Sequence, residues 1–326
     1  MDPTHNWLME GDPAIRWQVM RDLLDAPERE WQEERQRTLA EGWGARLLAL
    51  QDPDGCWGGG IYSPKWTSTT YTLLNLISIG IPPEQTGSRQ ESRARQGAGL
   101  VIDRLLGETC DAPFLKRLAE LDRCIVGMVL QIAVYFGIRD ERVDAIVDNL
   151  LSERMPDGAW NCRKDHRPKP PHHSSFHTTF NVLDGLRVYL ESGADHRRAE
   201  VQAAEGGALE LVLQHRLYKS DQTGAVINPK FTHLSFPFRW HYDALRGLEY
   251  FARAGAPYDR RLDDAVDLLR QRRDPDGCWP VQQKYSGKVF CEMEKTGKPS
   301  RWNTLRALRV LRWWESVSLR DKVPAG

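Results

Sequence analysis

The sequence predicts an all-α fold in which six helical hairpins surround one central cavity, an (α/α)6 toroid. Three observations predict it: a turn motif that recurs along the chain, six apolar segments of helical period, and enough apolar residues for a large core. The chain has 326 residues, of which 40% are hydrophobic. Helical rings of this length can form one domain, so we expect residues 1–326 to be a single domain.

The turn motif is Pro-Asp-Gly-x-Trp, and it occurs at residues 53–57, 156–160 and 275–279. Each copy follows an amphipathic stretch. Pro-Asp-Gly stops a helix there, because glycine readily adopts the left-handed backbone conformation. The tryptophan can then pack between neighbouring hairpins. The copies are spaced by roughly two hairpin periods, which predicts a repeated structural unit.

Six apolar segments with the helical period are the candidate inner helices of the ring. Each of the first five is followed by a more charged segment, which is typical of an outer helix facing solvent. The six segments begin near Pro13, Trp66, Asp122, His173, Arg239 and Arg301.

Composition narrows the classes of function. Lys plus Arg and Asp plus Glu are balanced at 45 each, which excludes a global basic field for nucleic acids. No stretch approaches the ~18 apolar residues of a membrane span, and the amino terminus does not resemble an export signal. We therefore expect a cytoplasmic protein with a small-molecule substrate in its cavity. Its six cysteines are then reduced thiols or metal ligands.

Metal-binding residue types gather at the starts of the third and fourth predicted inner helices. Asp122 and Cys124 begin one helix, and His177 follows one repeat later near the start of the next. Cysteine sulfur, histidine nitrogen and carboxylate oxygen suit zinc, and a catalytic zinc site keeps one position open. We predict a zinc site at these three residues, with Cys162 as the alternative ligand to Asp122.

A polar stripe runs along the fourth predicted inner helix. His173, His177, Asn181 and Asp184 recur at spacings of four, four and three residues, which places them on one helix face. Such a face should point into the cavity, so His173 and Asp184 are catalytic candidates. The alternative is that the histidines cap the helix or lie in a solvated loop, and that Cys124 belongs to the core.

A cation precedes a tryptophan at four of the six predicted helix starts. Helix amino termini attract anions, and an adjacent Lys or Arg strengthens this. We therefore predict an anion site for a phosphate, diphosphate or carboxylate, formed by Lys65, Trp66, Arg239, Trp240, Arg301 and Trp302. The alternative is that the tryptophans pack between hairpins while the cations pair with nearby carboxylates.

The densest of these clusters is Arg239-Trp240-His241-Tyr242-Asp243. His241 is available there as an acid or base, and Asp243 is a second catalytic candidate. Since Arg239 and Asp243 are four residues apart, an ordinary structural ion pair is the alternative. The run Arg261–Asp264 is interpreted as the start of a surface helix.

The Asp-Gly-x-Trp turns and the tract Ser68-Thr69-Thr70-Tyr71-Thr72-Leu73-Leu74 resemble the repeat of the prenyltransferase and squalene-cyclase superfamily over nearly the whole chain. This resemblance implies the toroid fold. Asp122-x-Cys124 with His177-Thr178 also resembles the zinc site of protein prenyltransferase β subunits, which implies that Asp122, Cys124 and His177 are zinc ligands. In that family the motif lies in the last hairpins, whereas here it lies in the third and fourth.

We therefore predict a prenyltransferase-like or terpene-cyclase-like enzyme that depends on zinc. Its substrate would be small, amphipathic and anionic, with an isoprenoid diphosphate as the first guess, and the reaction would be transfer, cyclisation or hydrolysis. Two alternatives stay open, since the fold does not determine the function. One is a lyase or hydrolase of an acidic sugar without a metal, and the other is a binding or scaffold toroid without catalysis.

Overall fold

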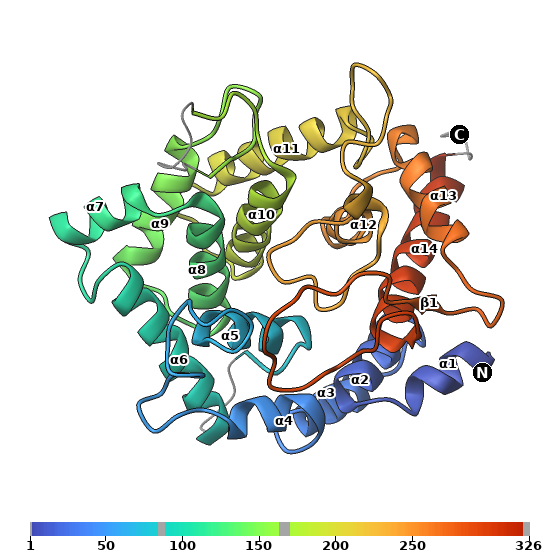
Figure 1. Ribbon diagram of the computed structural model, residues 1–326, viewed down its shortest axis with the longest axis horizontal. Helices are drawn as coiled ribbons and strands as arrows, with labels where there is room; N and C mark the ends of the chain where they lie inside the picture. Colours follow the sequence, from blue (N-terminus) through green and yellow to red (C-terminus); the bar gives the residue numbers. More distant parts are fainter. Residues whose placement is uncertain (1, 84–88, 163–169, 322–326) are drawn as a thin grey trace. The chain divides into compact units, whose positions relative to one another are not determined.

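The structure, a computed structural model, describes residues 2–83, 89–162 and 170–321. Its regular elements are helices apart from two short antiparallel strands, β1 (Trp279–Pro280) and β2 (Pro299–Ser300), in which Trp279 pairs with Ser300 (Figure 1). No helix in these ranges is both long and apolar enough to cross a bilayer.

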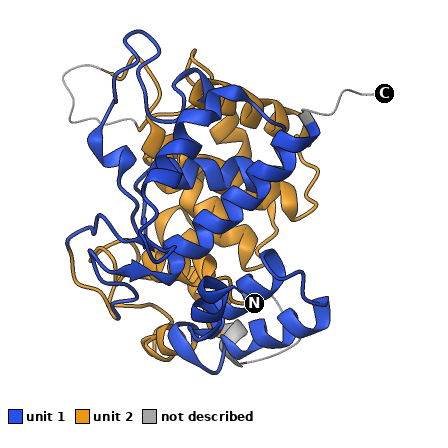
Figure 2. Ribbon diagram, turned by 90° about the vertical axis from the view of Figure 1, so that its right-hand side faces the viewer, with its two compact units in different colours: residues 1–44, 213–286, 291–326 blue, residues 45–212, 287–290 orange. Residues whose placement is uncertain are grey.

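Contacts within the chain define two compact units, which Figure 2 distinguishes by colour. Unit 1 comprises residues 1–44, 213–286 and 291–326, and unit 2 comprises residues 45–212 and 287–290. That residues 1–326 form a single domain stays a prediction.

Unit 2 is built from helical hairpins. The inner helices α5, α8 and α10 pack side by side in that order, α6 and α9 pack against α5 and α8, and an Arg187–Glu205 ion pair links α11 to α10. The helices assigned wholly or mainly to this unit are α4 (Gly42–Ala49), α5 (Thr69–Ser78), α6 (Arg89–Leu105), α7 (Ala112–Glu120), α8 (Arg123–Tyr135), α9 (Glu141–Ser152), α10 (Phe176–Glu191) and α11 (Arg198–Gln214).

Unit 1 has the same plan. Helix α14 packs between α12 and α2, while α3 packs on α2 and α13 packs on α12. Arg309 of α14 ties the three inner helices together, since it pairs with Asp22 at 2.7 Å and with Glu249 at 3.5 Å. The elements are α1 (Pro3–Met9), α2 (Pro13–Asp22), α3 (Glu28–Arg37), η1 (Pro229–Thr232), α12 (Ala244–Arg253), η2 (Arg260–Leu262), α13 (Asp263–Gln271) and α14 (Arg301–Asp321).

The predicted all-α fold is confirmed, and the succession of hairpins is that of the α/α toroid class. The six predicted inner helices correspond to α2, α5, α8, α10, α12 and α14. Three of them begin later than expected, at Thr69, Phe176 and Ala244. In each case, the preceding residues form an irregular segment that leads into the helix.

The three repeated tryptophans have the structural role that the motif predicts. Each indole Nε1 donates a 2.7 Å hydrogen bond to a carbonyl in the last turn of the preceding outer helix, at Leu47, Leu150 or Leu269. Each backbone N–H of the same tryptophan donates to a threonine hydroxyl on the next inner helix. These partners are Trp57–Thr69, Trp160–Thr179 and Trp279–Thr304, at 3.0, 3.3 and 3.0 Å.

Helices α8 and α10 approach each other until their backbones touch. A Cβ atom on Gly127 would lie 2.5 Å from the carbonyl oxygen of Asn181, and one on Gly185 would lie 2.5 Å from that of Gly127. Only glycine fits at such a crossing, because real Cβ atoms do not approach backbone that closely. The contact therefore sets the distance between the amino-terminal ends of these two helices.

Replacing Gly127 with alanine is expected to lower the free energy of unfolding by about 1–3 kcal/mol, because the new methyl group forces α8 and α10 apart. Urea unfolding of the purified protein measures the change.

Gly206→Ala in α11 is the matched control, since a Cβ at Gly206 would meet nothing within 4 Å. This change should stabilise the protein by up to about 1 kcal/mol through helix propensity. Equal effects of the two substitutions would contradict the close helix contact.

Candidate metal centre

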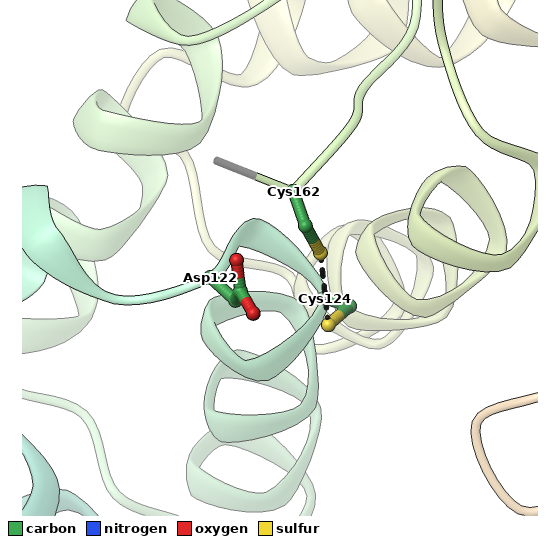
Figure 3. A group of neighbouring side chains, drawn as sticks. All are labelled: Asp122, Cys124 and Cys162. Carbon is green, nitrogen blue, oxygen red and sulfur yellow. Dashed lines mark hydrogen bonds between the residues drawn. The ribbon is translucent and has the colours of Figure 1, made fainter. Parts of the chain in front are cut away.

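A group of three metal-binding side chains lies at the amino-terminal end of α8 in unit 2 (Figure 3). Asp122 is the residue before the helix, and Cys124 is in its first turn. Cys162 comes from the segment between α9 and α10 and points down onto Cys124. One ligand atom from each residue lies within 4.8 Å of the other two.

Hydrogen bonds hold Cys162 in place. Its Sγ lies 3.1 Å from Sγ of Cys124 and 3.2 Å from the hydroxyl oxygen of Thr178, which is buried near the start of α10. Cys162 itself is 9% exposed. The Cys162 thiol thus joins the starts of the two helices that cross at Gly127.

The repeated tryptophan turn explains why Cys162 lies there. Trp160, two residues earlier, donates its backbone N–H to Thr179 and accepts hydrogen bonds at its carbonyl from Ser175 N–H and the Thr179 hydroxyl. The chain is therefore fixed against the start of α10 immediately before Cys162.

The two thiols differ in acidity. The hydrogen bond with Cys124 lowers the pKa of Cys162 to about 7, and the bond to Thr178 acts in the same direction. The same sulfur–sulfur contact, together with burial, raises the pKa of Cys124. The contact between the two sulfur atoms therefore favours one thiolate in the pair, and thiolate is the form that binds metals.

The donor set fits a zinc ion. Atom Oδ1 of Asp122 is buried and has no hydrogen-bond partner among the described residues, although such an acceptor is normally satisfied. Two thiolates on a tetrahedral zinc, with zinc–sulfur bonds of about 2.3 Å, are about 3.8 Å apart. The two sulfur atoms, at 3.1 Å, need to separate only slightly to reach that spacing.

The structure brings together Asp122, Cys124 and Cys162. Cys162 was expected as the alternative ligand to Asp122, but both residues belong to the group. His177 is not among the three residues of this group within the described ranges. It lies in the first turn of α10, next to Thr178, and its role as a ligand stays a prediction.

The expected polar stripe is interrupted, and this part of the interpretation is corrected. His173 is exposed and precedes α10, because Ser174 donates both its N–H and its hydroxyl to Asp157 and thereby holds the chain outside the helix. Asn181 is turned back onto the helix, where its side chain donates to the His177 carbonyl at 2.6 Å. Asp184 is half-buried within α10. Catalytic roles for His173 and Asp184 stay predictions.

Aromatic side chains lie within electrostatic reach of the cysteines. Burial is the main cause that raises the pKa of Tyr62 to about 12; the hydrogen bond from Tyr71 opposes it, and the charges of the Cys124, Cys162 and Asp122 group act in the same direction as burial. Tyr71 donates its hydroxyl to that of Tyr62 at 3.1 Å, and Trp66 packs edge-on against Tyr71 with ring centroids 4.8 Å apart.

Thr178 belongs to the His177-Thr178 motif, but its contact with Cys162 was not predicted, and Tyr62 was not predicted at all. Thr178 could have been found from its place between His177 and Thr179, the residue that receives the tryptophan turn. Tyr62 carries no such signal, because its proximity to the group of Asp122, Cys124 and Cys162 depends on segments that are distant in sequence.

Two of the predicted residues, Trp240 and His241, form an aromatic stack with Tyr285 in unit 1. His241 lies between Trp240 and Tyr285, with ring centroids 3.7 and 3.5 Å away. Arg239 immediately precedes the stack and has a left-handed backbone, with φ of 58°. Nothing in these contacts decides a catalytic role for His241, which stays a prediction.

Asp243 has a structural role in the same unit. It is fully buried and caps α12, where it accepts a hydrogen bond from Arg246 N–H at 2.9 Å. Its other carboxylate oxygen accepts from the N–H and hydroxyl of Ser235, at 3.1 and 2.7 Å. Both oxygens are thus used within the fold, which favours a cap over the proposed catalytic function.

The members of the predicted cation–tryptophan pairs differ in their surroundings, and some of them have structural contacts. Arg301 donates to the Trp7 carbonyl at 3.0 Å and lies 3.8 Å from Glu10, so it holds α1 against α14. Trp302 is buried and stacks on Phe236. Lys65 is exposed and lies 5.9 Å from the centre of the Trp66 ring. Substrate binding by these pairs stays a prediction.

The run Arg261–Asp264 is the start of a surface helix, as expected. The same helix contains the acidic string Asp263-Asp264-Ala265-Val266-Asp267. Asp264 pairs with Lys219 and Arg216 at 2.8 and 3.1 Å, and Asp267 is exposed and pairs with Arg270 at 3.2 Å. These ion pairs give the string a role on the surface of α13.

No protein-family model matches the chain, and no curated protein matches its sequence. Similar solved structures include a polysaccharide lyase, at 14% identity and a TM-score of 0.49, with 96% of this chain and 91% of that one covered. A glycosyl hydrolase of family 88 from Bacteroides vulgatus has 10% identity and a TM-score of 0.45, with 97% of this chain and 90% of that one covered. The type II terpene cyclase MstE from Scytonema has 14% identity and a TM-score of 0.33, with 86% of this chain and 97% of that one covered.

Replacing Asp243 with asparagine is expected to lower the free energy of unfolding by about 2–3 kcal/mol, because an amide cannot accept all three hydrogen bonds in a buried position. Thermal or urea unfolding measures the loss.

Asp111→Asn provides the control, since Asp111 caps α7 through Phe114 N–H in the same way but is exposed. The Asp111→Asn change should lower the free energy of unfolding by less than about 1 kcal/mol. An Asp243→Asn variant as stable as the wild type would contradict the structural role of Asp243 as a buried helix cap.

Proposed function

We propose that the chain is a zinc-dependent enzyme whose metal is bound by Asp122, Cys124 and Cys162. The observation that carries this proposal is the convergence of two thiols and one Asp122 carboxylate oxygen within 4.8 Å at the start of one helix, together with an Asp122 Oδ1 that is buried and has no hydrogen-bond partner in the described part of the chain. Such a set is costly to bury without a ligand, since the buried acceptor loses its hydrogen bond to water.

The chemistry of the donors favours zinc over other metals. Thiolate ligands select soft or borderline ions, whereas magnesium and calcium prefer sites made of oxygen alone. Three protein ligands leave one tetrahedral position for a substrate or water, which is the arrangement of catalytic zinc sites. His177 is the candidate for a fourth protein ligand, which would close the site.

The residues of the chain have separate functions in this proposal. Cys162 supplies the more acidic thiol, Thr178 orients it through its hydroxyl, and Asp122 supplies a carboxylate from the end of α8. When bound, zinc would lower the pKa of a thiol, hydroxyl or water in its open position and so make a nucleophile at neutral pH.

The neighbouring aromatic residues support an amphipathic substrate. Tyr62, Tyr71 and Trp66 form a continuous aromatic group, and exposed Lys65 adds a positive charge beside it. Trp66 and Tyr71 are buried, so an apolar chain with an anionic end, such as an isoprenoid diphosphate, would contact the half-buried Tyr62 with its chain and Lys65 with its charge. Transfer, cyclisation or hydrolysis would then use the activated nucleophile.

Backbone strain at Trp66 supports a binding role for this group. Trp66 has φ of 73°, a left-handed conformation that is unfavourable for a bulky side chain. Strained residues of this kind are kept where the surrounding structure fixes them, and they cluster at binding and active sites.

The purified protein is expected to contain about one zinc per chain, and Cys124→Ala and Cys162→Ala should each lose it, because each change removes a thiolate. Asp122→Ala should weaken binding without disturbing α8, since the Asp122 side chain makes no capping hydrogen bond. Elemental analysis of the untagged variants measures the metal.

Cys278→Ala is the control for these variants, since Cys278 is also a buried cysteine but lies in the turn at β1. It should keep its zinc. Loss of zinc in His177→Ala would reveal a fourth protein ligand and a closed site, which would contradict a catalytic zinc, whereas retention would agree with an open position. A wild-type protein that takes up no zinc would contradict the proposed function.

A further inference from the structure

The thiols of Cys124 and Cys162 lie at a distance between two bonded states. Their sulfur atoms are 3.1 Å apart. Two sulfurs on one tetrahedral zinc would be about 3.8 Å apart, and two sulfurs in a disulfide are about 2.05 Å apart. A shorter sulfur–sulfur distance would give the disulfide, and a longer one would give the zinc-bound pair. No single distance satisfies both.

We propose that Cys124 and Cys162 form a reversible disulfide when a hydroperoxide reaches the site, and that this disulfide and bound zinc exclude each other. The inference rests on the proposed function, because the exclusion requires that the two thiolates bind the metal. It gives the site a regulation that depends on oxidant.

The chemistry balances with the hydroperoxide as the oxidant. A thiolate attacks the peroxide oxygen, the O–O bond breaks, and for hydrogen peroxide the products are a sulfenic acid and hydroxide. The second thiol then attacks the sulfenic sulfur, the new S–S bond forms, and water leaves. Two thiols lose two electrons in total, and the peroxide is reduced to one water and one hydroxide, which becomes a second water when it takes up the proton that the first thiol lost on ionising.

The surroundings favour this pair over either thiol alone. The Thr178 hydroxyl lies 3.2 Å from the Cys162 sulfur and can stabilise its thiolate. Cys124 is already in contact with that sulfur, so it can resolve a sulfenic acid before a second peroxide oxidises it further. All six cysteines are free thiols in the structure. The next step would release zinc, since a disulfide sulfur is no longer an anionic ligand.

The test treats the zinc-loaded, full-length protein with hydrogen peroxide and follows two readouts that do not depend on catalysis. A colorimetric chelator measures released zinc, and peptide mapping without reduction locates disulfides. Zinc content is measured first in the reduced protein, so a failure of the proposed function is recognised before oxidation begins. Cys110→Ser is the control, because Cys110 is similarly half-buried but lies outside the site.

The expected result is one Cys124–Cys162 disulfide and about one zinc released per disulfide, both in wild type and in Cys110→Ser. Dithiothreitol followed by zinc should restore the starting metal content. Zinc bound in the reduced protein without any Cys124–Cys162 disulfide after peroxide, or a disulfide formed while zinc stays bound, would overturn the inference. Irreversible oxidation of Cys162 to a sulfinic acid would overturn it as well.

Discussion

Each of the three repeated tryptophans, Trp57, Trp160 and Trp279, fixes two helices through two hydrogen bonds, and the hairpins of the fold depend on this contact. The indole N–H satisfies a carbonyl at the end of an outer helix, where four carbonyls lack an intrahelical partner. The backbone N–H of the same residue reaches a threonine on the next inner helix. Because the tryptophans are fully buried, water cannot replace either bond, and the angle between successive hairpins is fixed at the turn.

One of these turns also creates the candidate metal centre. The Trp160 turn holds the chain against the start of α10, and Cys162 follows two residues later. The contact at Gly127 and Gly185 brings the start of α8 to the same place, with Asp122 and Cys124 on it. Two features that serve packing therefore place three ligand atoms within reach of one ion. A change in either feature should alter the metal site without touching a ligand.

The hairpins could be predicted from the sequence because their signals are local. Periodicity located the inner helices, and the glycine of each Pro-Asp-Gly turn has the positive φ that the motif requires, 86° at Gly55, 99° at Gly158 and 85° at Gly277. The donor set could be predicted only in part, since Asp122 and Cys124 share a helix start, whereas the position of Cys162 depends on a contact between distant segments. His173 was misplaced because helical spacing was extended past Ser174, which bonds Asp157 instead. The sequence could not distinguish a catalytic role of Asp243 from a capping role, because a buried cap and a catalytic carboxylate look alike in sequence.

The central claim is that the thiols of Cys124 and Cys162 bind zinc together with an oxygen of Asp122. The contacts of Cys162 with Cys124 and with Thr178, and the Asp122 oxygen that lacks a hydrogen-bond partner within the described residues, support that claim. The most direct test is X-ray absorption at the zinc edge of the reduced, zinc-loaded protein. The structure predicts a first shell of two sulfur atoms at about 2.3 Å with oxygen or nitrogen at about 2.0–2.2 Å. A shell without sulfur, or with four sulfur atoms, would contradict it.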